Sequence, residues 1–166
     1  LNVPYDSGLA FVREPGALPK SMSITAEYLP AAGTRRSPSD FTPELSRRAR
    51  GVEVWAALRS LGRRGLAELF ERNCRQARRF AERLARAGCE VLNDVELNQV
   101  LVSFGTPHVT RRVISAVQED GTCWCGGTVW QGRTAMRISV CSWATTDQDV
   151  EISIEAILRA ARQAHP

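Results

Sequence analysis

The sequence contains very little lysine: Lys20 is the only one among 22 basic residues, and the others are arginines. Any reaction that needs a lysine side chain must therefore use Lys20 or a lysine outside this sequence. The sequence also has no run of about 18 uninterrupted apolar residues, which is the length that a membrane-spanning helix needs. We therefore expect a soluble protein with no membrane partner.

Histidine is scarce as well, with only His108 and His165, and the five cysteines are odd in number and irregularly spaced. This pattern favours neither a disulfide framework nor a four-ligand zinc site, and it is typical of a reduced, cytoplasmic protein. Cys123 and Cys125 are the most closely spaced pair. In a strand this spacing places two small side chains on one face, so we expect no metal site.

The charge of the chain is unevenly distributed. The net charge is +4, but residues 35–86 contain 14 arginines and six acidic residues. Clustered arginine can mark a nucleic-acid site, yet no aromatic residues alternate with these arginines to stack on bases. We expect a solvated helix face with some arginines paired internally, and no nucleic-acid partner. Contact with an acidic protein remains an alternative.

The first 50 residues have little periodicity. A turn signal at residues 4–8 precedes Leu9–Val12, a short apolar run that predicts a buried strand whose partners lie outside this chain. Residues 14–43 contain five of the eight prolines, which predicts a long, mobile loop. Loops of this length are usually lids or linkers.

Helical periodicity begins at Gly51, is interrupted at Gly62 and Gly65, and ends at Gly88 as a C′ glycine. The remaining sequence predicts the order β-β-α-β-β-α. The strands are expected at residues 89–92, 99–104, 122–130 and 134–143, the first helix before Gly121 and the second after a capping box at residues 146–149. We expect an α/β protein whose second half is an antiparallel sheet covered on one face by helices.

Arg137 is unusual because it lies in the middle of an apolar strand. Met136 and Ile138 share one face of that strand, and Arg137 lies on the other. A buried arginine must be paired, and its planar fork suits a carboxylate. The partner could be a structural acid or a ligand.

Several motifs together resemble one enzyme family. Leu1–Gly8 is similar to the stretch after the His-Lys-Trp motif of the group II pyridoxal-phosphate-dependent amino acid decarboxylases, which include aromatic amino acid and glutamate decarboxylases. The likeness continues, in the same order and spacing, at Tyr28-Leu29, Leu45–Arg48, Gly51–Gly62, Gly121-Thr122 and Met136–Ser139.

This resemblance implies the type I aminotransferase-like fold, pyridoxal 5′-phosphate as cofactor, an amino acid substrate and a homodimer with active sites at the subunit interface. Tyr28 matches the catalytic tyrosine of a mobile loop. Leu45 and Ser46 match the segment that approaches the cofactor phosphate of the neighbouring subunit. Arg137 matches the arginine that holds the substrate carboxylate in the glutamate-specific branch.

The resemblance also implies that the internal-aldimine lysine lies upstream of Leu1, because Lys20 matches no catalytic position. We therefore expect the C-terminal part of a decarboxylase: the end of the cofactor domain (1–50), connecting helices (51–87) and a small domain (88–166). By itself this chain should be inactive. Alternatives are an aldehyde-forming or aminotransferase outcome, which Tyr28 rather than phenylalanine disfavours, and a stand-alone binding or dimerisation module.

Overall fold

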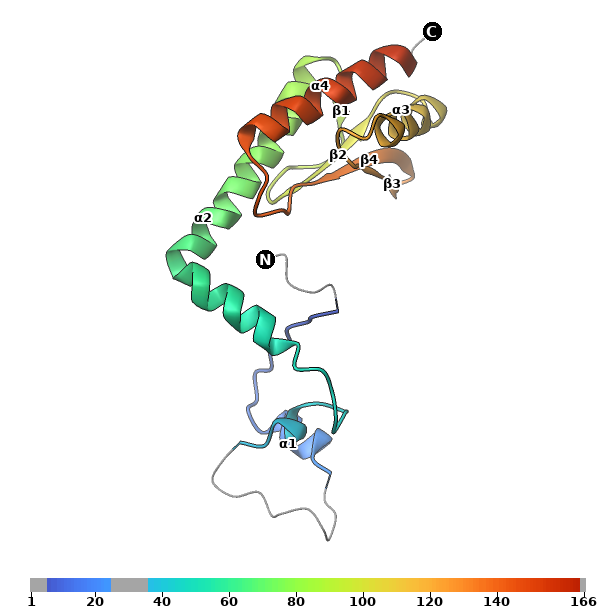
Figure 1. The fold of residues 1–166 in the computed structure, drawn as a ribbon. Helices are drawn as coiled ribbons and strands as arrows, with labels where there is room; N and C mark the ends of the chain where they lie inside the picture. Colours follow the sequence, from blue (N-terminus) through green and yellow to red (C-terminus); the bar gives the residue numbers. More distant parts are fainter. Residues whose placement is uncertain (1–5, 25–35, 165–166) are drawn as a thin grey trace. The chain divides into compact units, whose positions relative to one another are not determined.

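The computed structural model describes residues 6–24 and 36–164 (Figure 1). The chain divides into two compact units, one that ends at Ala56 and one that begins at Ala57. No helix in the described ranges is both long and apolar enough to cross a membrane.

The first unit contains two short helical segments, α1 (Ala17–Met22) and the 3₁₀ helix η1 (Pro38–Phe41). The expectation that residues 14–43 lack regular structure is wrong for these segments. The strand predicted at Leu9–Val12 was expected to pair outside this chain, and in this structure these residues are irregular, with Phe11 92% exposed. A strand requires a hydrogen-bonded neighbour, and no described residue pairs with this segment.

Helix α2 runs from Gly51 to Arg86 and is broken at Gly62, where φ is 63° and ψ is −177°. A residue with a side chain rarely adopts this positive φ, so glycine permits the kink. The predicted interruption at Gly62 is confirmed. The predicted interruption at Gly65 is wrong, because Gly65 continues the second helical segment.

The end of α2 is a Schellman motif, as the glycine signal predicts. Gly88 has a φ of 88°, its N–H donates to the Ala85 carbonyl at 2.9 Å, and the Cys89 N–H donates to the Leu84 carbonyl at 3.0 Å. These two bonds satisfy carbonyl groups that the helix end leaves without partners.

The second unit contains the predicted antiparallel sheet, with strand order β1-β2-β4-β3. The strands are β1 (Glu90–Val91), β2 (Gln99–Ser103), β3 (Gly126–Trp130) and β4 (Arg133–Ser139), and the helices are α3 (Pro107–Asp120) and α4 (Asp147–Ala164). The predicted element order is confirmed. All four strands are shorter than predicted, and residues 122–125 form a loop instead of the start of a strand.

The predicted helix ends of this unit are also confirmed. Thr146 and Asp149 form the capping box at the start of α4, since the Thr146 N–H donates to the Asp149 carboxylate at 2.8 Å and the Asp149 N–H donates to the Thr146 hydroxyl at 3.2 Å. Helix α3 ends at Asp120, and Gly121 caps it in the left-handed conformation with a φ of 73°.

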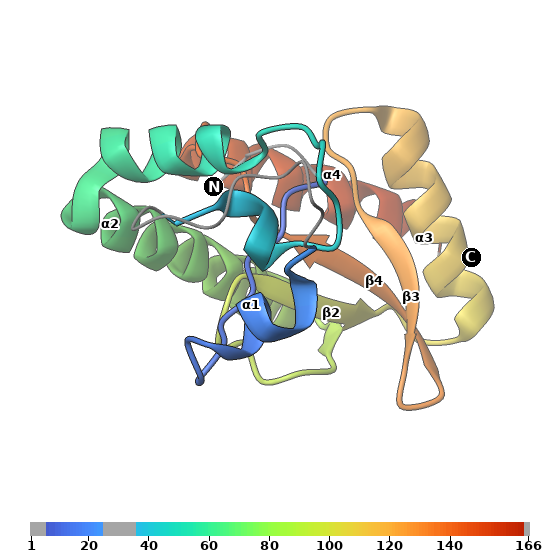
Figure 2. The same ribbon diagram turned by 90° about the horizontal axis from the view of Figure 1, so that it is seen from below.

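The hydrophobic core lies on one face of the sheet. Figures 1 and 2 show α3 and α4 on the same side of the strands. Alternate residues of β2 and β4 face these helices and the C-terminal half of α2, and the core includes Phe80, Leu84, Val100, Val102, Val113, Met136, Ile138, Val150, Ile154 and Ile157. The opposite face carries the intervening residues of the strands, and this is the face to which Arg137 belongs.

Candidate functional site

The sequence-predicted site residues belong to different parts of the chain. Tyr28 lies outside the described residues. Leu45 and Ser46 lie in the first compact unit, and Arg137 lies in the second.

Leu45 and Ser46 lie in the loop between η1 and α2, and both are exposed to solvent. Arg47 braces this loop. Its guanidinium donates one hydrogen bond to the Glu44 carbonyl at 3.0 Å and another to the Pro38 carbonyl at 3.1 Å. Because both acceptors are backbone atoms, these bonds fix the path of the loop on either side of Leu45 and Ser46.

The braced loop presents free hydrogen-bond donors. Within residues 6–24 and 36–164, no acceptor binds the backbone N–H of Leu45, Ser46 or Arg47. Arg48, the next residue, adds a second positive charge, and it pairs with Glu53 at 3.3 Å. Consecutive free N–H groups beside arginine side chains suit an anion such as a phosphate group. The sequence points to this segment only through its resemblance to a known family. Nothing in the sequence indicated that Arg47 would brace the loop.

An ion pair connects this region to the start of the chain. Arg50 Nε lies 2.7 Å from Asp6 Oδ2, across 44 positions of sequence. The hydrogen bond from Arg50 holds the pKa of the Asp6 carboxyl below its usual value. Asp6 lies within the family-like segment Leu1–Gly8, and Arg50 lies between the family-like segments Leu45–Arg48 and Gly51–Gly62. No local sequence pattern predicts this ion pair, since the only signal is the three arginines among residues 47–50.

Arg137 lies at the centre of β4, paired with Leu101 of β2 on one side and Gly126 of β3 on the other. Its neighbours Met136 and Ile138 are buried in the core, whereas Arg137 is exposed on the opposite face. No residue in the described part of the chain forms a hydrogen bond or ion pair with its guanidinium. None of these residues is an acidic partner for Arg137, so its guanidinium is available to a carboxylate ligand.

A second arginine on the same face of β4 has a different role. Arg133 forms a bidentate ion pair with Glu90 of β1, and its hydrogen bonds lower the pKa of the Glu90 carboxyl. Glu90 is in register with Ser103 of β2, so the ion pair bridges over the intervening strand. The Arg133 guanidinium is therefore paired with the edge strand β1, whereas the Arg137 guanidinium has no partner among the described residues.

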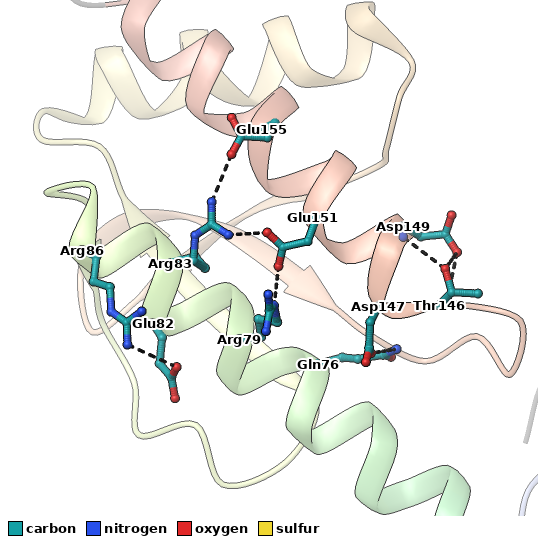
Figure 3. A network of polar contacts seen from close by, with 10 residues as sticks. All are labelled: Gln76, Arg79, Glu82, Arg83, Arg86, Thr146, Asp147, Asp149, Glu151 and Glu155. Atoms are coloured by element: carbon teal, nitrogen blue, oxygen red, sulfur yellow. Dashed lines mark hydrogen bonds and ion pairs between the residues drawn. The ribbon is translucent and has the colours of Figure 1, made fainter.

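The arginine-rich part of α2 pairs internally with α4, as the sequence predicts. Figure 3 shows Arg79 and Arg83 directed at Glu151, and Arg83 also reaches Glu155 at 3.1 Å. Beside them, the Gln76 amide donates to the Asp147 carboxylate at 3.0 Å (Figure 3). These contacts fasten α2 to the helix that covers the sheet carrying Arg137.

The Glu151 carboxylate, which pairs with both Arg79 and Arg83, is expected to make a pH-dependent contribution to the free energy of unfolding. Its hydrogen bond from Arg79, followed by the charges of Arg79 and Arg83, lowers the pKa of Glu151 from 4.5. The contribution is therefore complete above pH 4.5 and is lost as the pH falls through the lower pKa of the folded state. We expect Glu151→Gln to lower the free energy of unfolding by up to about 1 kcal/mol at neutral pH.

Urea unfolding of both proteins at neutral pH and at about pH 3 measures this effect. The difference between wild type and Glu151→Gln should shrink at the lower pH. Glu96→Gln is the matched control, because Glu96 is exposed and its carboxylate forms no ion pair with any described residue. An equal loss in both variants, or a difference that does not depend on pH, would contradict the assigned network.

A small cavity of about 110 Å³ lies near the end of β4. It is lined by Leu69, Phe70, Asn73, Cys74, Leu97, Asn98 and Cys141. The buried Oδ1 atom of Asn73 has no hydrogen-bond partner in the described residues. Small-molecule sites usually measure about 300–1,000 Å³, so this cavity is too small to hold an amino acid substrate.

Comparison with known proteins gives one consistent result. The profile of the pyridoxal-dependent decarboxylase conserved domain matches residues 1–106. Histidine decarboxylase of Drosophila melanogaster is 26% identical over 155 residues, which are 90% of this chain and 18% of that protein. The chain thus spans about a fifth of the length of this relative.

Solved structures agree with the fold. Oryza sativa TDC with PLP and tryptamine superposes with a TM-score of 0.83 at 21% identity, over 92% of this chain and 34% of that one. Catharanthus roseus tryptophan decarboxylase in complex with L-tryptophan gives 0.76 at 18% identity, also over 92% and 34%. Mouse CSAD gives 0.74 at 15% identity, over 87% and 34%. These likenesses confirm the predicted fold class.

Proposed function

Because the chain belongs to the pyridoxal-dependent decarboxylase family, we propose that it forms the C-terminal part of an enzyme that converts an L-amino acid to an amine and carbon dioxide. The observation that carries this proposal is the family match over residues 1–106, which includes Tyr28, Leu45 and Ser46. The catalytic lysine would be supplied by the preceding part of the protein. Lys20 is exposed on α1 and matches no catalytic position.

We propose pyridoxal 5′-phosphate as the cofactor and a homodimer as the working assembly, in the cytoplasm. The exposed loop at Leu45 and Ser46 has the free N–H donors and the neighbouring arginines that a phosphate group requires. In this arrangement the loop would contact the phosphate of the cofactor held by the partner subunit. When bound, the cofactor accepts the electron pair left on the substrate as carbon dioxide departs.

Tyr28 would supply a proton to the substrate carbon that has lost its carboxylate. A phenol on a loop that closes over a site can deliver that proton and exclude bulk water at the same time. Leu45 and Ser46 bind and orient, whereas Tyr28 moves the proton. In this proposal, residues 1–50 form the end of the cofactor domain, residues 51–87 form the connecting helices, and residues 88–166 form the small domain.

The direct test is an assay of the full-length protein with pyridoxal phosphate and a panel of L-amino acids, with detection of both amine and carbon dioxide. The proposal predicts equal amounts of the two products. Release of an aldehyde or a keto acid in place of the amine would favour the alternative outcomes. The 166-residue chain by itself should form no borohydride-reducible aldimine, and formation of one would show that it has its own cofactor lysine.

Arg137 provides a separate test of substrate binding. If its free guanidinium holds a substrate carboxylate, Arg137→Met should raise KM about ten- to a hundredfold, because charge-assisted hydrogen bonds contribute about 1.5–3 kcal/mol. Arg112→Met is the matched control, since Arg112 is also exposed and forms no hydrogen bond or ion pair with the described residues. Steady-state kinetics and thermal unfolding should be measured together. Lower thermal stability with an unchanged KM would assign Arg137 a structural role.

A further inference from the structure

A cavity of about 470 Å³ lies in the second compact unit, where the end of α2 leads into β1. Four segments line it: the end of α2, the start of β1, the end of β2 and the last turns of α4. Its volume lies within the range of about 300–1,000 Å³ that is usual for small-molecule sites. Leu45, Ser46 and Arg137 are not among the residues that line it, so this cavity is distinct from the sites described above.

Part of the cavity lining is apolar, and part is bare backbone. Phe104 at the end of β2 and Ala161 on α4 are buried, and Leu158 on α4 is half-buried. Gly88 and Gly105 also line the cavity, and their φ angles are 88° and 101°. A Cβ atom at either glycine would have no neighbour within 4 Å, so the absence of side chains leaves room beside their backbone groups.

The cavity lining includes hydrogen-bond donors that have no acceptor. Arg162 in the last turn of α4 is exposed and forms no hydrogen bond or ion pair with the described residues. The Gly105 N–H has no acceptor among them either. The Ser103 hydroxyl already donates to the Gly105 carbonyl at 3.2 Å, and the Glu90 carboxylate is paired with Arg133. The free charge of Arg162 therefore favours an anionic group, and its planar fork suits a carboxylate.

The end of α2 supplies hydrogen-bond acceptors to the same cavity. The Leu84 and Ala85 carbonyls accept the two bonds of the Schellman motif, whereas the Ala87 and Gly88 carbonyls accept none from the described residues. Ala87 and Gly88 both line the cavity. The C-terminal end of a helix carries a partial negative charge, which favours a cationic group. The lining thus combines acceptors for an ammonium group with a guanidinium for a carboxylate.

We propose that this cavity binds small zwitterions in which a short apolar chain joins a carboxylate to an ammonium group. The carboxylate pairs with Arg162, and the ammonium group donates to the carbonyls of Ala87 and Gly88. The apolar chain lies against Leu158 and Ala161. This binding is independent of the proposed decarboxylase activity, because it needs neither the cofactor nor any residue assigned to catalysis.

The experiment titrates the purified 166-residue chain, without cofactor, with 5-aminopentanoate in a calorimeter at neutral pH and low salt. Pentanoate and pentylamine are the comparison ligands, because each keeps only one of the two charged groups. We expect 5-aminopentanoate to bind about tenfold more tightly than either of them. Equal affinity for one of the comparison ligands, or no saturable binding of 5-aminopentanoate, would overturn the proposal.

Arg162→Met tests the carboxylate end of the site. We expect about ten- to a hundredfold weaker binding of 5-aminopentanoate, because the variant loses a charge-assisted hydrogen bond. Arg112→Met is the matched control, since Arg112 is exposed, has no partner among the described residues and does not line the cavity. Circular dichroism verifies that both variants are folded. An affinity that Arg162→Met leaves unchanged would contradict the role of Arg162.

The reactivity of a cysteine locates the bound ligand without any substitution. Cys89 is half-buried and lines the cavity, whereas Cys74 is also half-buried and lies outside this lining. Saturating 5-aminopentanoate should slow the alkylation of Cys89 by iodoacetamide severalfold and leave the rate at Cys74 unchanged. This measurement decides the question even if Arg162→Met fails to fold. The same rate at Cys89 with and without ligand would show that 5-aminopentanoate binds elsewhere, against the proposal.

Discussion

Tyr28→Phe is expected to reduce amine production by the complete enzyme about 10²–10⁴-fold in kcat, with little change in cofactor binding. The substitution removes only the phenol oxygen and keeps the aromatic ring. The large effect follows from the proposed role, in which the phenol returns a proton to the substrate carbon. If the loop also limits side reactions, part of the lost amine should reappear as aldehyde.

Amine formation and the absorbance of bound cofactor, measured on the same samples, separate catalysis from binding. Tyr5→Phe is the matched control, because Tyr5 is the only other tyrosine and has no assigned catalytic role. Unchanged turnover in Tyr28→Phe would refute the role of Tyr28 in proton transfer. Loss of cofactor in that variant would instead indicate a binding role.

Ile154→Ala is expected to lower the free energy of unfolding of the second compact unit by about 2–5 kcal/mol. Ile154 lies on α4, is completely buried, and belongs to the core between the helices and the sheet. Alanine removes three carbon atoms and leaves a cavity that the close-packed neighbours fill only in part. A loss of this size is a large fraction of the stability of a small unit.

Ile152→Ala is a matched control on the same helix, because Ile152 is 49% exposed. Urea unfolding followed by circular dichroism should show a loss of less than about 1 kcal/mol for this variant. Similar losses at positions 152 and 154 would mean that α4 does not cover the sheet through the face described above.

The elements that the sequence predicted well are those with local signals. Gly88 marks the end of α2 because only a few neighbouring residues decide whether a left-handed conformation closes the helix. Thr146 and Asp149 mark the start of α4 for the same reason. Leu9–Val12 forms no strand among the described residues, because an apolar run becomes a strand only where another strand is available to pair with it.

The candidate site was predictable to a smaller extent. Leu45, Ser46 and Tyr28 are assigned only through their place in a family pattern, and no property of these residue types by itself points to a cofactor. For Arg137, the strand alternation correctly separated it from Met136 and Ile138. The alternation could not show whether the guanidinium is paired, since that depends on which acids the rest of the fold brings within reach.

In the second unit, the sequence by itself determined the order of the elements, their helical or extended character and the helix ends, because these depend on hydrogen bonds and side-chain periodicity within a few residues. Only the tertiary structure decided which charges meet. Arg83 pairs with Glu151 across 68 positions, whereas Arg137 has no partner in the described residues. Such differences arise from the packing of distant segments, and no local pattern encodes them.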